Sequence, residues 1–149
     1  MALIESLANI TDVAHVIQLA VAPAFLLTGI GAILSVLVNR LTRVVDRFRV
    51  LEQVLPQAQG DLLASVQTEM DVLAHRARMV HWAIGLGTSA ALFICVVIAT
   101  LFIGSIMSLQ MPFIIASLFV MAMLALVAGL LCFLREIALA KGSIHVLQR

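Results

Sequence analysis

The sequence predicts an all-α membrane protein with three transmembrane helices, and three observations lead to this fold class. Of the 149 residues, 63% are apolar and 11% are charged, whereas a soluble domain is about 45–50% apolar and about 25% charged. Two long stretches carry no Asp, Glu, Lys or Arg, and together they are long enough for three bilayer spans. The net charge of +1 leaves no basic excess to neutralise phosphates, so we expect no nucleic-acid partner.

The first uncharged stretch, residues 13–39, is bounded by Asp12 and Arg40 and is predicted to form the first span. Its 27 residues exceed the roughly 20 that a helix needs to cross the hydrocarbon core. Pro23 lies inside it and favours a kink over a break, because neighbouring groups can satisfy the freed carbonyl. Residues 1–12 are predicted to be an external segment, and their lack of Lys and Arg argues against a cleaved signal peptide.

The second uncharged stretch, residues 82–134, is 53 residues long and fits two spans joined by a tight turn. The turn is predicted at residues 108–112, because Pro112 suits the first turn of a helix, where its missing N–H would be unpaired anyway. The second span is therefore predicted at residues 82–107 and the third at residues 112–134.

The basic residues predict the orientation of these spans. Six of the nine lie between the first and second spans, three follow the third, and none lies elsewhere. The positive-inside rule makes that side cytoplasmic, so the N-terminus is expected outside and the C-terminus inside. Residues 135–149 are predicted to be a cytoplasmic tail that holds the last turns of the third helix and is broken at Gly142.

Residues 40–81 are predicted to form a cytoplasmic helical hairpin that extends the first two spans. Apolar residues recur there at alternating spacings of three and four, as at the a and d positions of a coiled coil. The first row is Leu41, Val44, Phe48, Leu51 and Leu55, and the second is Leu63, Val66, Met70, Leu73, Ala77 and Val80. Pro56 and Gly60 separate the rows, and Asp61 is predicted to cap the second helix. The two rows can pack against each other or face neighbouring subunits.

A row of small and polar residues, which we call the polar row, follows the same alternation along the first span. Its members are His15, Gln18, Ala22, Phe25, Gly29, Ala32, Val36, Asn39, Arg43 and Asp46, flanked by Thr28, Ser35 and Arg47. Such residues mark helix–helix contact or a wet lumen, because lipid gives no reason to select them. One interpretation is close packing within the three-helix unit, where Gly29 and Gly31 admit a neighbour. The other is a central pathway in a homo-oligomer with the first helix nearest the symmetry axis.

The pathway interpretation gives our leading hypothesis, a small oligomeric ion channel or pore. The residues predicted to line it, or to form an interface there, are Asp12, His15, Gln18, Thr28, Gly29, Ser35, Asn39, Arg43 and Asp46. The alternative is a non-catalytic accessory or scaffold subunit of a larger membrane complex. It would bind a partner protein or lipid through the polar row and the cluster at residues 40–47.

Arginines near the predicted membrane boundary are candidates for anchoring lipid or a partner. Arg43 and Asp46 are three residues apart and can pair on one helix face. Arg40 and Arg47 would then be free for lipid phosphates or a partner carboxylate. The full set predicted for lipid or partner anchoring is Arg40, Arg47, Arg49, Arg76 and Arg78.

Patterns that indicate catalysis are absent from the sequence. It contains no P-loop, HExxH, CxxC, GxSxG or GxGxxG pattern, and no nucleophile is predicted beside a base. Asp71 and His75 lie four residues apart, but two ligands do not fix a zinc site. We therefore expect no enzymatic activity, no metal and no cofactor, and we expect membrane lipids as partners.

Two segments carry a family resemblance. The sequence HVIQLAVAPAFLLTGIGA at residues 15–32, followed by RLTRVVDR at residues 40–47, resembles small bacterial membrane proteins of the domain-of-unknown-function family number 2721. In that family a proline-containing first span runs into an RLxRxxDR pattern. The basic residues at 76–78 and Ala83-Ile84 also match the family's entry into its second span. The resemblance implies a multi-pass protein of the bacterial inner membrane and supplies no catalytic residues.

Overall fold

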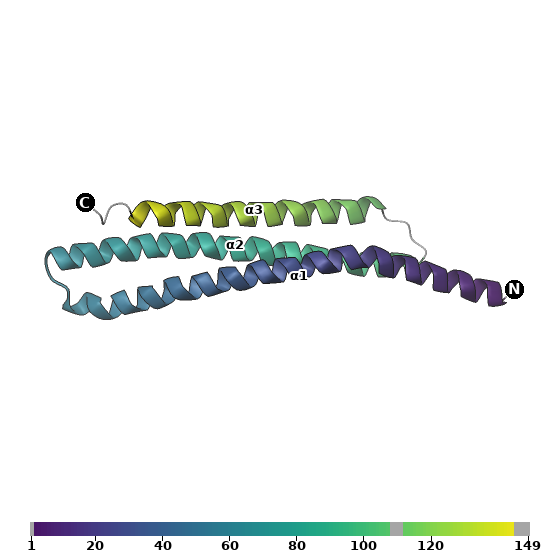
Figure 1. Cartoon of the computed structure of the whole chain (residues 1–149), viewed down its shortest axis with the longest axis horizontal. Helices are drawn as coiled ribbons and strands as arrows, with labels where there is room; N and C mark the ends of the chain where they lie inside the picture. The colour runs from purple at the N-terminus through teal and green to yellow at the C-terminus, as the bar shows by residue number, and fades with distance from the viewer. Residues whose placement is uncertain (1, 108–111, 145–149) are drawn as a thin grey trace. The chain divides into compact units, whose positions relative to one another are not determined.

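The fold is a computed structural model in which residues 2–107 and 112–144 are described, with side chains described at 14–107 and 112–138. Helix α1 spans Ala2–Val54, the 3-10 turn η1 spans Leu55–Gln57, α2 spans Asp61–Ile106 and α3 spans Pro112–Ile144 (Figure 1). The predicted all-α class is confirmed. No strand occurs among the residues that are described.

Each of the three α-helices is long and apolar enough to cross a membrane. The candidate spans are Ala14–Gln57, Asp61–Ile106 and Pro112–Ala138, and each contains a long, strongly apolar segment with few charged residues. Helix α1 runs through Pro23 without a break and is already helical at Ala2, earlier than the span predicted to begin at residue 13. The three helices therefore indicate an integral membrane protein.

The start of α3 agrees with the prediction, but its predicted end is wrong. Helix α3 begins at Pro112 as expected, while residues 108–111 of the predicted turn lie outside the described residues. Helix α3 then continues through Gly142 to Ile144, so the break predicted there does not occur. A glycine inside a helix costs only about 1 kcal/mol relative to alanine, which the rest of the helix can offset.

The chain divides into two compact units. Unit 1 comprises Met1–Ala32 and Gly87–Leu126, and unit 2 comprises Ile33–Leu86 and Val127–Arg149. Among the side chains of unit 1 that are described, the buried ones are small or aliphatic, which is typical of close helix packing. They are Ala20, Pro23, Ile30, Gly87, Ala90, Ile94, Val97 and Ala122.

Unit 2 contains the predicted hairpin, in which parts of α1 and α2 lie side by side (Figure 1). Val44 and Leu51 from α1 form a buried cluster with Val66 and Leu73 from α2. Phe48, Leu55, Met70 and Ala77 pack against this cluster. The two apolar rows therefore pack against each other, as the first of the two interpretations predicted.

The turn between α1 and α2 has the residues that the sequence indicated. Pro56 lies in η1, where the N–H of Ala58 donates to the carbonyl of Leu55 at 3.3 Å. Gly60 adopts a φ of +59°, a left-handed conformation that glycine reaches without a Cβ penalty. Asp61 is the first residue of α2 and not the residue before it, so the predicted cap lies one position inside the helix.

A second cluster in unit 2 includes residues from all three helices. Leu37 of α1 is buried with Val80 and Ala83 of α2. Cys132 and Phe133 of α3 pack against them. Helix α3 is thereby held against the hairpin close to where its uncharged stretch ends at Leu134.

Candidate functional site

The polar row of α1 lies on the exposed face of the helix. Every member of the row is exposed, and Asp12, which was predicted to line the pore with it, lies outside the residues whose side chains are described. The opposite face is buried, with Ile30 at 1% and Leu37 at 2% exposure. A Cβ placed on Gly29 or Gly31 would meet nothing within 4 Å. The interpretation that the row serves close packing within the three-helix unit is therefore wrong.

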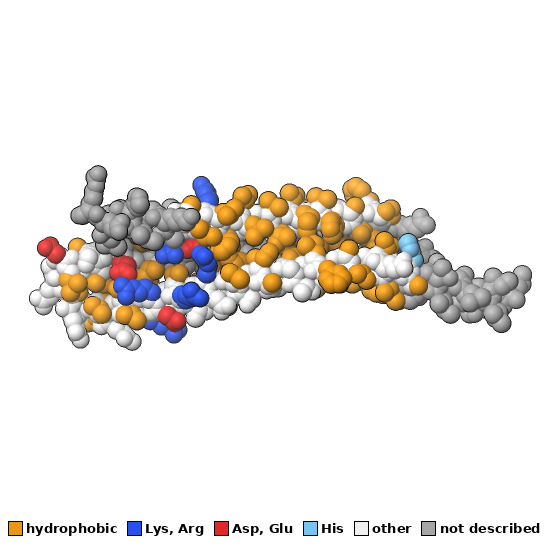
Figure 2. Space-filling view, in the orientation of Figure 1, with side chains coloured by type: hydrophobic (Ala, Val, Ile, Leu, Met, Phe, Trp, Pro, Cys, Tyr) orange, Lys and Arg blue, Asp and Glu red, His pale blue; other side chains and the backbone are white. Residues whose placement is uncertain are grey.

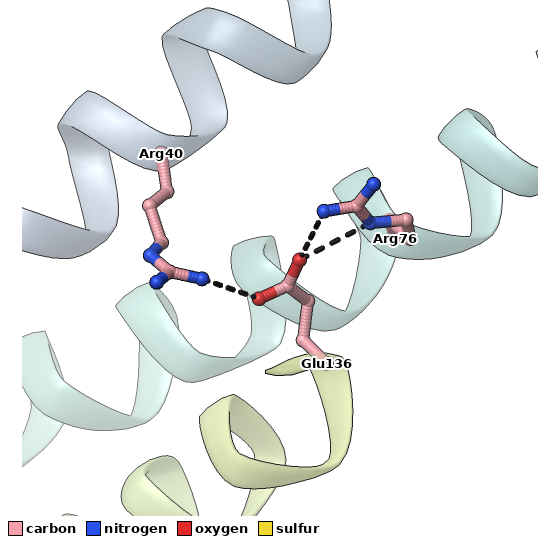
Figure 3. A network of polar contacts seen from close by, with 3 residues as sticks. All are labelled: Arg40, Arg76 and Glu136. Carbon is pink, nitrogen blue, oxygen red and sulfur yellow. Dashed lines mark hydrogen bonds and ion pairs between the residues drawn. The ribbon is translucent and has the colours of Figure 1, made fainter. Parts of the chain in front are cut away.

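A buried carboxylate joins the three helices of unit 2. Glu136 of α3 is 1% exposed and lies between two arginines (Figure 3). Arg40 of α1 donates through Nη1 to Oε2 at 3.2 Å. Arg76 of α2 donates to Oε1 through Nη2 at 2.8 Å and through Nε at 3.2 Å. We call these three residues the clamp.

The buried face of α3 positions Glu136, and an aromatic ring of the same helix contacts Arg40. Ala122, Gly129 and Glu136 of α3 are all buried and recur every seven residues, so Glu136 continues the inward line of its helix. The guanidinium of Arg40 lies 5.1 Å from the ring centroid of Phe133, a cation–π distance. Since Phe133 is one turn before Glu136, α3 contacts Arg40 through both a ring and a carboxylate.

The two arginines of the clamp compensate the buried negative charge of Glu136, and the clamp as a whole carries a net positive charge. Two guanidinium groups face one carboxylate, so one unit of positive charge is uncompensated. The side chain of Glu136 is 2% exposed, while those of Arg40 and Arg76 are 42% and 27% exposed. Every buried side-chain nitrogen or oxygen in the described part of the chain has a hydrogen-bond partner. A buried carboxylate requires such compensation, because an unpaired one would be very costly.

The clamp also aligns the ends of the uncharged stretches. Arg40 directly follows the first stretch, Glu136 is the second residue after the other, and Arg76 lies six residues before Trp82. Because their side chains are in contact, the three helices leave the uncharged zone at one level. Trp82 is 63% exposed near this level, as is typical of aromatic residues at a membrane interface. Charged side chains gather over this part of unit 2 on the face seen in Figure 2.

The structure corrects the expected roles of two arginines. Arg40 and Arg47 were predicted to have no ion-pair partner within the chain, yet Arg40 is in the clamp and Arg47 donates through Nε to Glu69 at 2.9 Å, while both side chains remain partly exposed. Arg43 and Asp46 are exposed, and the ion pairs of the described residues do not include one between them. Their side chains thus remain available to groups outside the chain.

The other predicted anchoring residues differ in their surroundings. Arg76 belongs to the clamp, whereas Arg49 and Arg78 are exposed and form no ion pair with any described residue. Among the described side chains, no group of three or more His, Cys, Asp or Glu could hold a metal ion. The chemistry of this region is therefore that of guanidinium groups and one buried carboxylate.

Sequence reasoning gave Glu136 no role. The signal was present in the spacing, because Glu136 lies seven residues after Gly129 and fourteen after Ala122 on a helix otherwise apolar up to Leu134. An acidic residue on the small-residue face of such a helix needs a basic partner. The sequence alone offers several arginines and does not say which two are near it.

Together, three apolar helices and an interfacial charge cluster define a multi-pass helical membrane protein. The sequence profile of the family described as Protein of unknown function (DUF2721) matches residues 20–146. The chain therefore belongs to that family, and the resemblance drawn from residues 15–32 and 40–47 is confirmed. No curated protein and no solved structure matches the chain.

Proposed function

We propose that the chain is a subunit of a homo-oligomeric channel or pore of the inner membrane, with the polar row of α1 facing the symmetry axis. The observation that carries this proposal is the exposure of the row on a helix that is otherwise apolar. Polar side chains within a bilayer face a protein partner or water and avoid lipid tails. The three helices of one chain provide neither to this face.

The glycine of the row supports close approach by a second helix. Gly29 has open space where a side chain would be, and small residues at a helix surface let two backbones come close in a membrane. The hydroxyl of Thr28 donates to the carbonyl of Ala24 at 3.3 Å, so its own polar group is already satisfied within the helix. A parallel neighbour can therefore pack here without leaving that hydroxyl unpaired.

The charged end of the row supports assembly of identical copies. Arg43 and Asp46 are exposed, opposite in charge and one helical turn apart. In a ring of parallel α1 helices, Arg43 of one copy can pair with Asp46 of the next, because a cyclic interface repeats the same contact around the axis. With the basic residues on the cytoplasmic side, this ring of charges forms the inner mouth, and His15 lies toward the outer one.

The first test is the architecture of the full-length protein, determined by single-particle imaging in nanodiscs. A closed ring with α1 around an axial cavity is expected. A monomer, or a ring with α1 facing lipid, overturns the proposal. Gly29→Leu should break the ring, whereas Ala116→Leu, which adds the same side chain to an exposed position of α3, should leave it intact.

The second test is ion flux into liposomes that contain the purified protein. Gln18→Ala and Arg43→Ala should each change the flux, because both residues are placed on the path. Ser117→Ala and Arg49→Ala are the matched controls, since these residues are exposed outside the proposed path. Unchanged flux in both path variants contradicts a pore. A different membrane protein that co-purifies in fixed stoichiometry on the α1 face, without flux, favours the scaffold subunit instead.

A further inference from the structure

We propose that the clamp presents a binding site for the headgroup of an anionic phospholipid, with Arg40 as the principal ligand to the phosphate. This site lies outside the polar row and does not depend on whether α1 lines a pore. The ligand chemistry is a phosphate diester in a lipid with net negative charge.

The first argument is that contacts within the chain hold the guanidinium group of Arg40 in place but use only part of its hydrogen-bonding capacity. An arginine has five N–H donors in a planar fork, and Arg40 uses Nη1 for its contact with Glu136. The guanidinium carbon also lies 5.1 Å from the ring centroid of Phe133, so a second contact with α3 helps to hold the side chain in place. Its side chain is still 42% exposed, so part of the fork faces outward. A fixed fork loses little freedom when it binds a phosphate.

The second argument is the local charge. The clamp keeps one unit of positive charge after Glu136 is neutralised. Arg78 and Arg135 are exposed near it along α2 and α3, and neither forms an ion pair with a described residue. The acidic residues Asp46 and Asp71 are at least five residues from Arg40 and Arg76 along their helices, which is about 7.5 Å of helix rise. An excess of positive charge therefore remains at this level.

The third argument is depth. The clamp lies where the uncharged stretches of α1 and α3 end, and the exposed Trp82 marks the same boundary on α2. Lipid phosphates are the abundant acceptors at that depth. Each basic residue near an anionic membrane surface contributes about 1 kcal/mol, or about fivefold in affinity.

The test is lipid binding to the full-length protein in detergent, followed by native mass spectrometry. Phosphatidylglycerol and phosphatidylcholine with identical acyl chains are the probes, because both have a phosphate diester and only the first is anionic. We expect retention of phosphatidylglycerol at least about fivefold tighter than of phosphatidylcholine. Equal retention of the two lipids overturns the proposal. So does competition by millimolar inorganic phosphate, which would make free phosphate the ligand.

Two variants test the assigned residues. Arg40→Lys keeps the charge beside Glu136 but removes the planar fork, and it should weaken the retention of phosphatidylglycerol, because an ammonium group cannot bind the phosphate through two parallel N–H bonds. The double variant Arg78→Gln/Arg135→Gln leaves the clamp intact and should lower the preference for phosphatidylglycerol over phosphatidylcholine by about fivefold or more, so the test does not depend on a clamp variant that fails to fold.

The matched control is Arg49→Gln. It removes one exposed arginine located nine residues beyond Arg40 on the same helix, about 13 Å farther from the membrane boundary. Its lipid preference should equal that of the wild type. A loss of about fivefold, the effect expected for any one basic charge, would mean that net charge, and not this site, selects the lipid.

Discussion

Arg76 donates two hydrogen bonds to a single oxygen of Glu136, through Nη2 at 2.8 Å and Nε at 3.2 Å, across the packing of α2 against α3. Arg40 donates one hydrogen bond, at 3.2 Å, to the other carboxylate oxygen of Glu136. The two arginines are therefore not equivalent. The side chain of Arg76 is the less exposed of the two, at 27% against 42%.

This asymmetry predicts unequal losses of stability. Arg76→Gln should lower the free energy of unfolding by about 1.5–3 kcal/mol, the range for hydrogen bonds to charged groups. Arg40→Gln should cost about 1 kcal/mol, because one longer and more exposed bond is lost. Reversible unfolding in mixed micelles, followed by helical circular dichroism, measures both values. Equal losses, or a larger loss for Arg40→Gln, would contradict the arrangement in Figure 3.

Removing both arginines should cost more than either change alone. In Arg40→Gln/Arg76→Gln the buried carboxylate of Glu136 has no cation, and loss of the partners of a buried charge costs about 3–5 kcal/mol. Adding Glu136→Gln to this variant should recover much of the loss, because the amide carries no charge. The same unfolding experiment gives the comparison. If the triple variant is no more stable than the double, charge compensation is not what the clamp provides.

The hairpin core gives a prediction with an internal control. Leu73 is 7% exposed in the cluster with Val44 and Leu51, whereas Leu62 on the same helix is 54% exposed. Leu73→Ala should lower the unfolding free energy by about 2–4 kcal/mol, because it removes buried methyl groups and leaves a cavity. Leu62→Ala should change it by no more than about 0.5 kcal/mol. Similar effects of the two substitutions would show that the rows do not form the core.

The helices and the hairpin were predictable because they depend on local patterns. The length of an uncharged stretch indicates a helix long enough to span a membrane. The spacing of apolar residues such as Val44 and Leu51 indicates which face of the helix is buried. The break at Gly142 was predicted wrongly, because one glycine has a small cost that a long helix absorbs. The absence of a break at Pro23 was predicted correctly, because in a membrane helix neighbouring groups can satisfy the carbonyl that a proline leaves free.

The clamp was not predictable because it depends on which helix faces meet. The pair considered from the sequence, Arg43 with Asp46, is local to one helix, whereas Arg40 and Glu136 are 96 residues apart. Sequence spacing can place Glu136 on the small-residue face of α3, but it does not say which faces of α1 and α2 are turned toward α3. The polar row follows from the spacing of residues along α1, whereas whether it faces the other two helices or away from them depends on how those helices pack.

The ion pair between Arg47 and Glu69 is expected to contribute far less than the clamp. Its atoms are 2.9 Å apart, close to the distances in the clamp, but the two side chains are 54% and 43% exposed. Water and salt screen such a pair, and double-mutant cycles on exposed pairs give about 0.2–1 kcal/mol. We expect a coupling energy in that range for Arg47→Gln with Glu69→Gln, decreasing as salt is raised to about 1 M, where the screening length is about 3 Å.

The matched cycle uses Arg76→Gln with Glu136→Gln. Because Glu136 is 2% exposed, solvent screens this pair much less, and its coupling energy should be larger and nearly independent of salt. Both cycles are measured by unfolding in the same micelles at low and high salt. A salt-sensitive coupling at Glu136, or a coupling at Glu69 that exceeds it, would mean that burial does not control the strength of these contacts. The clamp would then lose its role as the charged link that fixes α3 against the hairpin.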